Sequence, residues 1–186
     1  MTEEVSRKIN RGWTTRDIMV TAIISIGLGV LYIPITYFTA WLMAFPFALA
    51  LVIGIYYWPI IMVSYLIRKP GTALFAALVV FIMMVPLTPY GLQVVAMVLL
   101  IGLPIEIALL VGRYKFKLWS MMLAGGLSGL VNSVMPFITM GFGNLSPILQ
   151  VVYFVEFTVC SALVGGLLAK WIGDAVINTG VITPAE

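Results

Sequence analysis

The sequence predicts an all-α integral membrane protein, a six-transmembrane-helix bundle with both termini on the cytoplasmic side. Of its 186 residues, 62% are hydrophobic and 9% are charged, and the mean hydropathy is +1.14. Soluble domains carry about 25% charged residues and about 45–50% apolar ones. The apolar runs are also far longer than the about 9–11 residues of a membrane β-strand. A water-soluble fold is therefore excluded.

Six apolar runs follow a polar segment, residues 1–15, which we predict to be cytoplasmic. The second run contains Gly54 and Pro59, and we interpret it as one kinked helix. Residues 16–172 thus form one transmembrane domain, and residues 173–186 form a predicted cytoplasmic tail. Each run is near the roughly 20 residues that a crossing helix needs. The predicted spans are 16–37, 44–67, 71–87, 91–112, 117–140 and 147–172.

The positions of Lys and Arg support this count and orientation. With six spans, all 10 basic residues fall at the N-terminus, in the loops after the second and fourth spans, or at the C-terminal end. The other three loops contain none. Positive charge in short loops marks the cytoplasmic side, so both termini are predicted inside. This distribution also explains the pI near 9.1 without a nucleic-acid partner.

Missing residues exclude several kinds of chemistry. The sequence has no histidine, and Cys160 is its only cysteine, which removes histidine metal sites, the commonest acid–base catalyst and an intrachain disulfide. It has no phosphate-binding loop of the G-x-x-x-x-G-K-[ST] kind. We therefore predict no catalytic residue, metal site or cofactor, and no ATP hydrolysis by this chain.

Two carboxylic acids lie well within the predicted spans: Glu106 and Glu156. An ionisable group at this depth costs roughly 2.5–3.5 kcal/mol on insertion scales and is a candidate functional group. Pro104 is predicted to kink the helix beside Glu106. No basic residue lies at this depth, so each acid is protonated, solvated, hydrogen-bonded or matched by a ligand cation. For both residues, the alternative stays open that a neutral glutamic acid forms a hydrogen bond to a neighbouring helix.

Polar and aromatic side chains on other spans could complete a binding site. Asn132 and Ser128 are four residues apart, and Tyr153 and Glu156 three apart, so each pair shares a helical face. Aromatic rings beside carboxylates suit a flat, cationic or nitrogen-rich heterocycle. Packing against neighbouring helices is the alternative for any one ring. The candidate substrate-binding residues are Glu106, Glu156, Asn132, Tyr56, Tyr57, Trp58 and Tyr153.

Small residues recur on one face of the first span. Thr21, Ser25 and Gly29 lie four residues apart, and Ala22 lies beside them. Such a face lets another helix approach closely. The spacing fits packing within the bundle as well as an interface with a separate subunit.

Several segments occur in an order that is familiar from one family: RDIMVTAIIS and GLGVLY in the first span, SYLIRKPGTAL after the second, PIEIALLVGRYK in the fourth, MLAGGLSG in the fifth and GGLLAKWIGDAVINTGV at the end. Together they resemble the substrate-binding S-components of energy-coupling-factor (ECF) vitamin transporters. The branch indicated is the one associated with hydroxymethylpyrimidine and thiamine.

The resemblance implies a small six-helix protein of the cell membrane that captures a vitamin or its precursor near the outer face. It implies partners that supply the energy, namely a transmembrane T-component and two cytoplasmic ABC ATPases. Glu106 matches a glutamate of the family's fourth helix, which implies a ligand contact. Thr21, Ala22, Ser25 and Gly29 occupy the region of the family's T-component interface.

We therefore expect capture of thiamine or its hydroxymethylpyrimidine precursor at the outer side, followed by inward delivery. Two other classes stay open on the sequence. One is an ion-coupled permease with Glu106 and Glu156 as relay groups. The other is a structural subunit of a larger membrane complex that binds no ligand.

Overall fold

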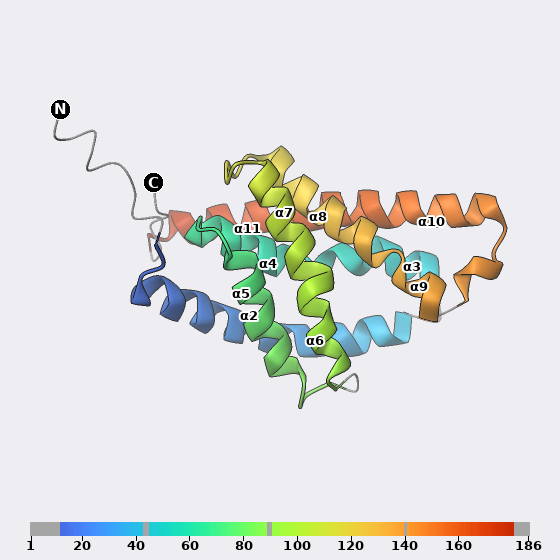
Figure 1. Ribbon diagram of the computed structural model, residues 1–186, viewed down its shortest axis with the longest axis horizontal. Helices are drawn as coiled ribbons and strands as arrows, with labels where there is room; N and C mark the ends of the chain where they lie inside the picture. The colour runs from blue at the N-terminus through green and yellow to red at the C-terminus, as the bar shows by residue number, and fades with distance from the viewer. Residues whose placement is uncertain (1–11, 43–44, 89–90, 140, 181–186) are drawn as a thin grey trace.

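A computed structural model describes residues 12–42, 45–88, 91–139 and 141–180. Within these ranges every regular element is helical, which confirms the all-α fold (Figure 1). The first half contains α2 (Thr15–Leu42), α3 (Pro46–Val52), the 3₁₀ turn η1 (Ile53–Tyr56), α4 (Trp58–Ile67) and α5 (Thr72–Met84). The second half contains α6 (Gln93–Met97), the π-helical turn η2 (Val98–Gly102), α7 (Leu103–Val111), α8 (Leu118–Asn132), α9 (Met135–Thr139), the 3₁₀ turn η3 (Phe142–Asn144), α10 (Pro147–Cys160), the π-helical turn η4 (Ser161–Gly165) and α11 (Gly166–Asn178).

Within the described ranges, five helical runs are long and apolar enough to cross a membrane. The remaining apolar helix, α5, has 13 residues and spans only about 20 Å. The hydrocarbon core is roughly 30 Å thick, so the count of six crossings stays a prediction. The five runs are Thr15–Leu42, Ala48–Ile67, Gln93–Val111, Leu118–Ile138 and Pro147–Asn178.

Two predicted spans, the first and the last, end well before the observed helices do. The first helix continues past Pro34 to Leu42 rather than ending at residue 37. The last helix continues to Asn178, into the segment predicted as a tail. Residues 1–11 and 181–186 lie outside the described ranges, so the cytoplasmic location of both ends stays a prediction.

The second run is one interrupted helix, as the sequence predicts. Its break is η1, which passes directly against η4 of the last run. A Cβ atom at Gly54 would lie 2.6 Å from Val164 Cβ and 3.1 Å from the Cys160 carbonyl oxygen. Glycine is therefore required there for the two breaks to touch.

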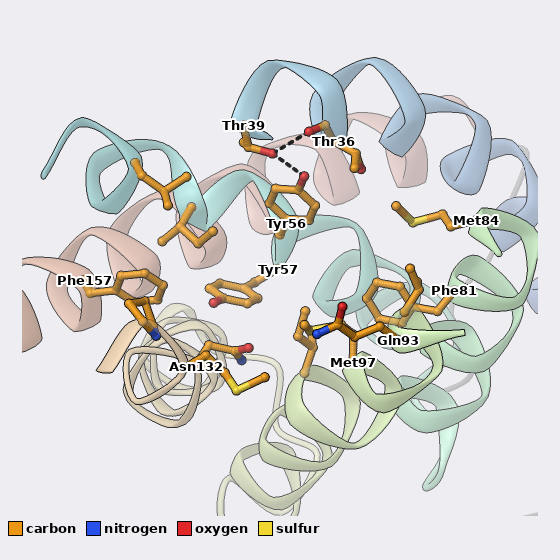
Figure 2. Close-up of a pocket in the computed structure, with 16 residues that line it drawn as sticks. Thr36, Thr39, Tyr56, Tyr57, Phe81, Met84, Gln93, Met97, Asn132 and Phe157 are labelled. Carbon is orange, nitrogen blue, oxygen red and sulfur yellow. Dashed lines mark hydrogen bonds between the residues drawn. The ribbon is translucent and has the colours of Figure 1, made fainter. Parts of the chain in front are cut away.

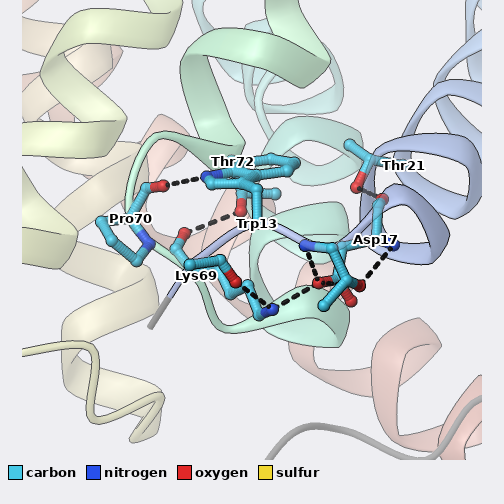
Figure 3. A network of polar contacts seen from close by, with 8 residues as sticks. Trp13, Asp17, Thr21, Lys69, Pro70 and Thr72 are labelled. Atoms are coloured by element: carbon cyan, nitrogen blue, oxygen red, sulfur yellow. Dashed lines mark hydrogen bonds and ion pairs between the residues drawn. The ribbon is translucent and has the colours of Figure 1, made fainter. Parts of the chain in front are cut away.

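Hydrogen bonds join the start of α2 to the loop between α4 and α5 (Figure 3). Lys69 Nζ donates to the Asp17 carboxylate and, at 2.8 Å, to the carbonyl of Gly12. Trp13 Nε1 donates to the carbonyl of Pro70 at 3.0 Å. Because Lys69 is 8% exposed, its charge needs these partners.

The same end of the bundle also holds the loop between α7 and α8 and the end of α11. Tyr65 donates to Asp174 Oδ1 at 2.6 Å, and the Tyr65 ring lies 5.7 Å from the ring of Phe116. We call this the polar end, defined by residues 12–17, 68–71, 113–117 and 170–174. It contains every basic residue within the described ranges.

The core is built around α4. Its residues Pro59 to Ile67 are all buried, as expected of a helix that is apolar on every side and enclosed by others. By contrast, large apolar side chains of α2 and α10 face outward, for example Ile23 at 64% and Val151 at 62% exposed. These outer faces suit contact with lipid.

Cysteine labelling tests the predicted orientation. In a Cys160→Ser background, Ser146→Cys should react with a membrane-impermeant maleimide in intact cells, because the loop before α10 carries no basic residue. Lys115→Cys, in the basic loop after α7, should react only after permeabilisation. The opposite pattern would show that the termini face outward.

Candidate functional site

A cavity of about 350 Å³ lies at the end of the bundle opposite the polar end. It is bounded by the last turns of α2, α5 and α8 and by the first turn of α6. Helices α2 and α5 start at the polar end, and the cavity contacts Thr39 and Met84 near their far ends. Its volume falls within the roughly 300–1,000 Å³ of small-molecule sites.

The cavity wall is aromatic, thioether-rich and neutral (Figure 2). Among the described residues that line it, none is charged. The polar members are Thr36, Thr39, Gln93 and Asn132. The larger apolar members include Tyr56, Tyr57, Phe81, Phe157, Met84, Met97 and Met135. Such a wall can stack on a flat ring and offer it a few hydrogen bonds.

Hydroxyl groups join α2 to η1 along one side of the cavity. Thr39 Oγ1 and Tyr56 Oη lie 2.5 Å apart, as Figure 2 shows. Tyr32, which is fully buried, donates to the backbone carbonyl of Tyr56. Thr36 Oγ1 donates to the carbonyl of Tyr32 at 2.7 Å. These bonds fix the Tyr56 ring in the wall.

Asn132 contributes the most buried amide of the wall, at 8% exposed. Its Nδ2 lies 2.9 Å from the Leu100 carbonyl oxygen and 2.9 Å from the Ser128 carbonyl oxygen. In a regular helix the residue four after Leu100 would donate to that carbonyl, but this residue is Pro104, which has no N–H. The Asn132 side chain therefore supplies a donor where the α6–η2–α7 run is broken.

A second aromatic cluster lies behind Phe157. Tyr153 is fully buried there, with its ring 5.0 Å from Phe142 and 5.5 Å from Phe157. This cluster, which also includes Ala50, packs α10 against α3. Tyr153 thus supports a wall residue and does not itself line the cavity.

Of the predicted substrate-binding residues, the structure brings Tyr56, Tyr57 and Asn132 together at the cavity. Trp58 follows the break at η1, and its ring packs on the main core instead. Glu156 is half-buried on α10 and does not line the cavity either. Tyr153 is on the side of α10 that packs against α3, so its predicted contact with a substrate, like that of Glu156, stays a prediction.

Glu106 does not line this cavity either, so its predicted contact with a ligand stays a prediction. Its Oε1 accepts from the Gly71 N–H at 2.6 Å and its Oε2 from the Ala73 N–H at 3.0 Å. The Gly71 N–H belongs to the cap residue of α5 and the Ala73 N–H to its first turn, so neither has an acceptor within the helix, and Gly71 has no side chain that could supply one. A carboxylate there is also favoured by the helix dipole.

Tyr114, in the loop after α7, donates to the same carboxylate. Burial and the bond to Glu106 raise the pKa of Tyr114 above its ordinary value, so the hydroxyl keeps its proton. Glu106 is thereby bonded to both loops of the polar end. The sequence leaves several states open for Glu106, and the structure shows one of them, hydrogen bonding to a neighbouring helix.

Comparisons with known proteins find matches that cover most of the chain. Residues 16–131 match the family described as the permease component of an ABC-type cobalt transport system. The HMP/thiamine permease protein YkoE of Bacillus subtilis (strain 168) is 30% identical over 176 residues, 92% of this chain and 88% of that protein. The crystal structure of an S-component of an ECF transporter superposes with a TM-score of 0.84 at 30% identity, covering 91% of this chain and 88% of that one.

The chain belongs to the ECF S-component family. It is accordingly a multi-pass protein of the plasma membrane, and its relatives are transport subunits. The structural match covers 91% of this chain.

Most of the small-residue face of this S-component is buried within the bundle, and its predicted contact with a T-component stays a prediction. Thr21 and Ser25 are fully buried, and Gly29 packs on α5. A Cβ atom at Gly29 would lie 3.4 Å from Met83 Cβ and 3.6 Å from the Val80 carbonyl oxygen. The face therefore serves packing within the bundle, and only Ala22 at its edge is half-buried.

Sequence reasoning missed several wall residues of the S-component. Thr36 and Thr39 are three residues apart near the end of the first run, which was a usable signal for one polar face. Gln93 opens an otherwise apolar run and was another. Phe81 and Phe157 carried no such signal, since aromatic residues are common throughout the spans.

Glu106→Ala should lower the thermal unfolding temperature of the detergent-solubilised protein. The change leaves buried donors of α5 and Tyr114 without their acceptor, at roughly 1–3 kcal/mol for each unsatisfied group. The matched control is Glu156→Ala, because Glu156 makes no hydrogen bond to other described residues. Equal unfolding temperatures for wild type and Glu106→Ala would contradict the capping role.

Proposed function

We propose that this S-component captures thiamine or its hydroxymethylpyrimidine precursor in the cavity at the outer side of the membrane. The observation that carries the proposal is the neutral, aromatic cavity at the end without basic residues. The name of the B. subtilis relative supports the same substrate class. Tyr56, Tyr57 and Asn132 are the predicted residues that we retain as substrate contacts.

The chemistry of the wall suits a flat, nitrogen-containing ring. Tyr57 and Phe157 present aromatic surface from η1–α4 and from α10, and the methionines can adapt to the edge of a ligand. A thiazolium cation would have to rely on ring faces, since no described wall residue carries a negative charge. A neutral aminopyrimidine needs no counter-ion.

Transport then requires other chains. The sequence contains no phosphate-binding loop, so energy for inward delivery would come from a T-component and two ABC ATPases. The ion-coupled alternative is weakened by the placement of its two acids. Glu106 is bonded at the polar end, whereas Glu156 lies on α10, and neither lines the cavity.

Calorimetry with purified protein tests the binding site. Wild type should bind hydroxymethylpyrimidine or thiamine, and Tyr57→Leu should bind about three- to tenfold more weakly because it loses ring stacking. Tyr37→Leu is the matched control, since Tyr37 is 55% exposed on the outer face of α2. Failure of wild type to bind either compound would refute the proposal.

Reconstitution separates capture from transport. Liposomes that contain this chain alone should retain bound vitamin without accumulating it, whether or not an ion gradient is applied. Accumulation that an uncoupler abolishes, without ATP, would favour the permease instead.

A further inference from the structure

The backbone around Asn132 fixes the orientation of its amide. The Leu100 and Ser128 carbonyl oxygens each lie 2.9 Å from Nδ2, and a carbonyl oxygen can only accept a hydrogen bond. The flipped amide would place Oδ1 against both carbonyl oxygens. The nitrogen must therefore face the backbone, and both of its N–H groups are used there.

The remaining polar atom of this side chain is Oδ1. Asn132 is 92% buried and lines the cavity, and Figure 2 shows its amide on the cavity side of α8, below Tyr57. No donor from the described parts of the chain reaches Oδ1. An acceptor that borders the cavity and has no partner among the described residues can pair with a donor that a ligand supplies.

Two features strengthen Oδ1 as an acceptor. Donation by Nδ2 to two carbonyls polarises the amide toward its oxygen. The amide is also held before the ligand arrives, so no side-chain freedom remains to be lost on binding. The threonines of the wall differ, because their hydroxyls already bond to α2 carbonyls such as those of Tyr32 and Ile35.

We propose that Asn132 determines the specificity of the cavity by accepting a hydrogen bond from the exocyclic amine of an aminopyrimidine ring. This inference rests on the proposed function, since it concerns the same ligand class. The site then selects amino-pyrimidines over oxo-pyrimidines, which present an acceptor where the amine presents donors. A site built to pair with an N–H rejects an analogue that lacks it.

A ligand series tests this with the wild-type protein. Hydroxymethylpyrimidine is compared with analogues in which a methyl group or a carbonyl oxygen replaces the exocyclic amine. We expect the affinity for the amine to be at least about tenfold higher than the affinity for the methyl analogue. The oxo analogue should bind most weakly of the three. An oxo analogue that binds more tightly than the methyl analogue would overturn the inference.

A variant assigns the effect to the residue. In Asn132→Leu, the amine and oxo ligands should bind within about threefold of one another. Ser128→Ala is the matched control, because it keeps the backbone carbonyl that orients the amide, and it should retain the wild-type preference. Undiminished preference in Asn132→Leu would overturn the inference.

If Asn132→Leu does not fold, the ligand series with the wild-type protein still tests the inference. It also separates the two proposals. Wild type that binds no pyrimidine and no thiamine refutes the proposed function. Wild type that binds the amine and oxo ligands equally leaves that function in place and refutes the role of Asn132.

Discussion

The bilayer core offers no water to a backbone N–H or C=O group, so every break in these helices must be satisfied by another part of the protein. Side chains from neighbouring helices do this at three places. Glu106 accepts from the first turn of α5, Asn132 donates to the carbonyl left by Pro104, and Tyr32 donates to the carbonyl of Tyr56 at η1. The arrangement of the bundle depends on these three cross-helix contacts.

Two of these contacts also shape the cavity. Asn132 lines it directly, and Tyr32 holds the backbone from which Tyr56 projects into the wall. The third, Glu106, joins the loops of the polar end and does not line the cavity. The breaks in the helices thus shape the cavity and also require polar side chains to satisfy the backbone groups beside it.

The sequence was sufficient for the helical class, the positions of most spans and the continuity of the second run, because these follow from long apolar runs. The sequence could not show which of the polar residues line the cavity. Glu106 and Asn132 are both polar groups at membrane depth, yet only Asn132 faces the cavity, since the partner of Glu106 is a backbone that composition does not reveal. Likewise, Thr21, Ser25 and Gly29 form a small-residue face, but spacing alone does not show that α5 already covers it.

The length of α5 has a consequence for the surrounding lipid. A helix of about 20 Å beside runs of 19 to 32 residues presents an uneven hydrophobic height around the protein. Acyl chains next to α5 must compress or tilt to match it, at a cost of fractions of a kcal/mol per Å of mismatch. If α5 crosses the bilayer as the sequence predicts, we therefore expect shorter-chain lipids to be favoured along that side of the protein.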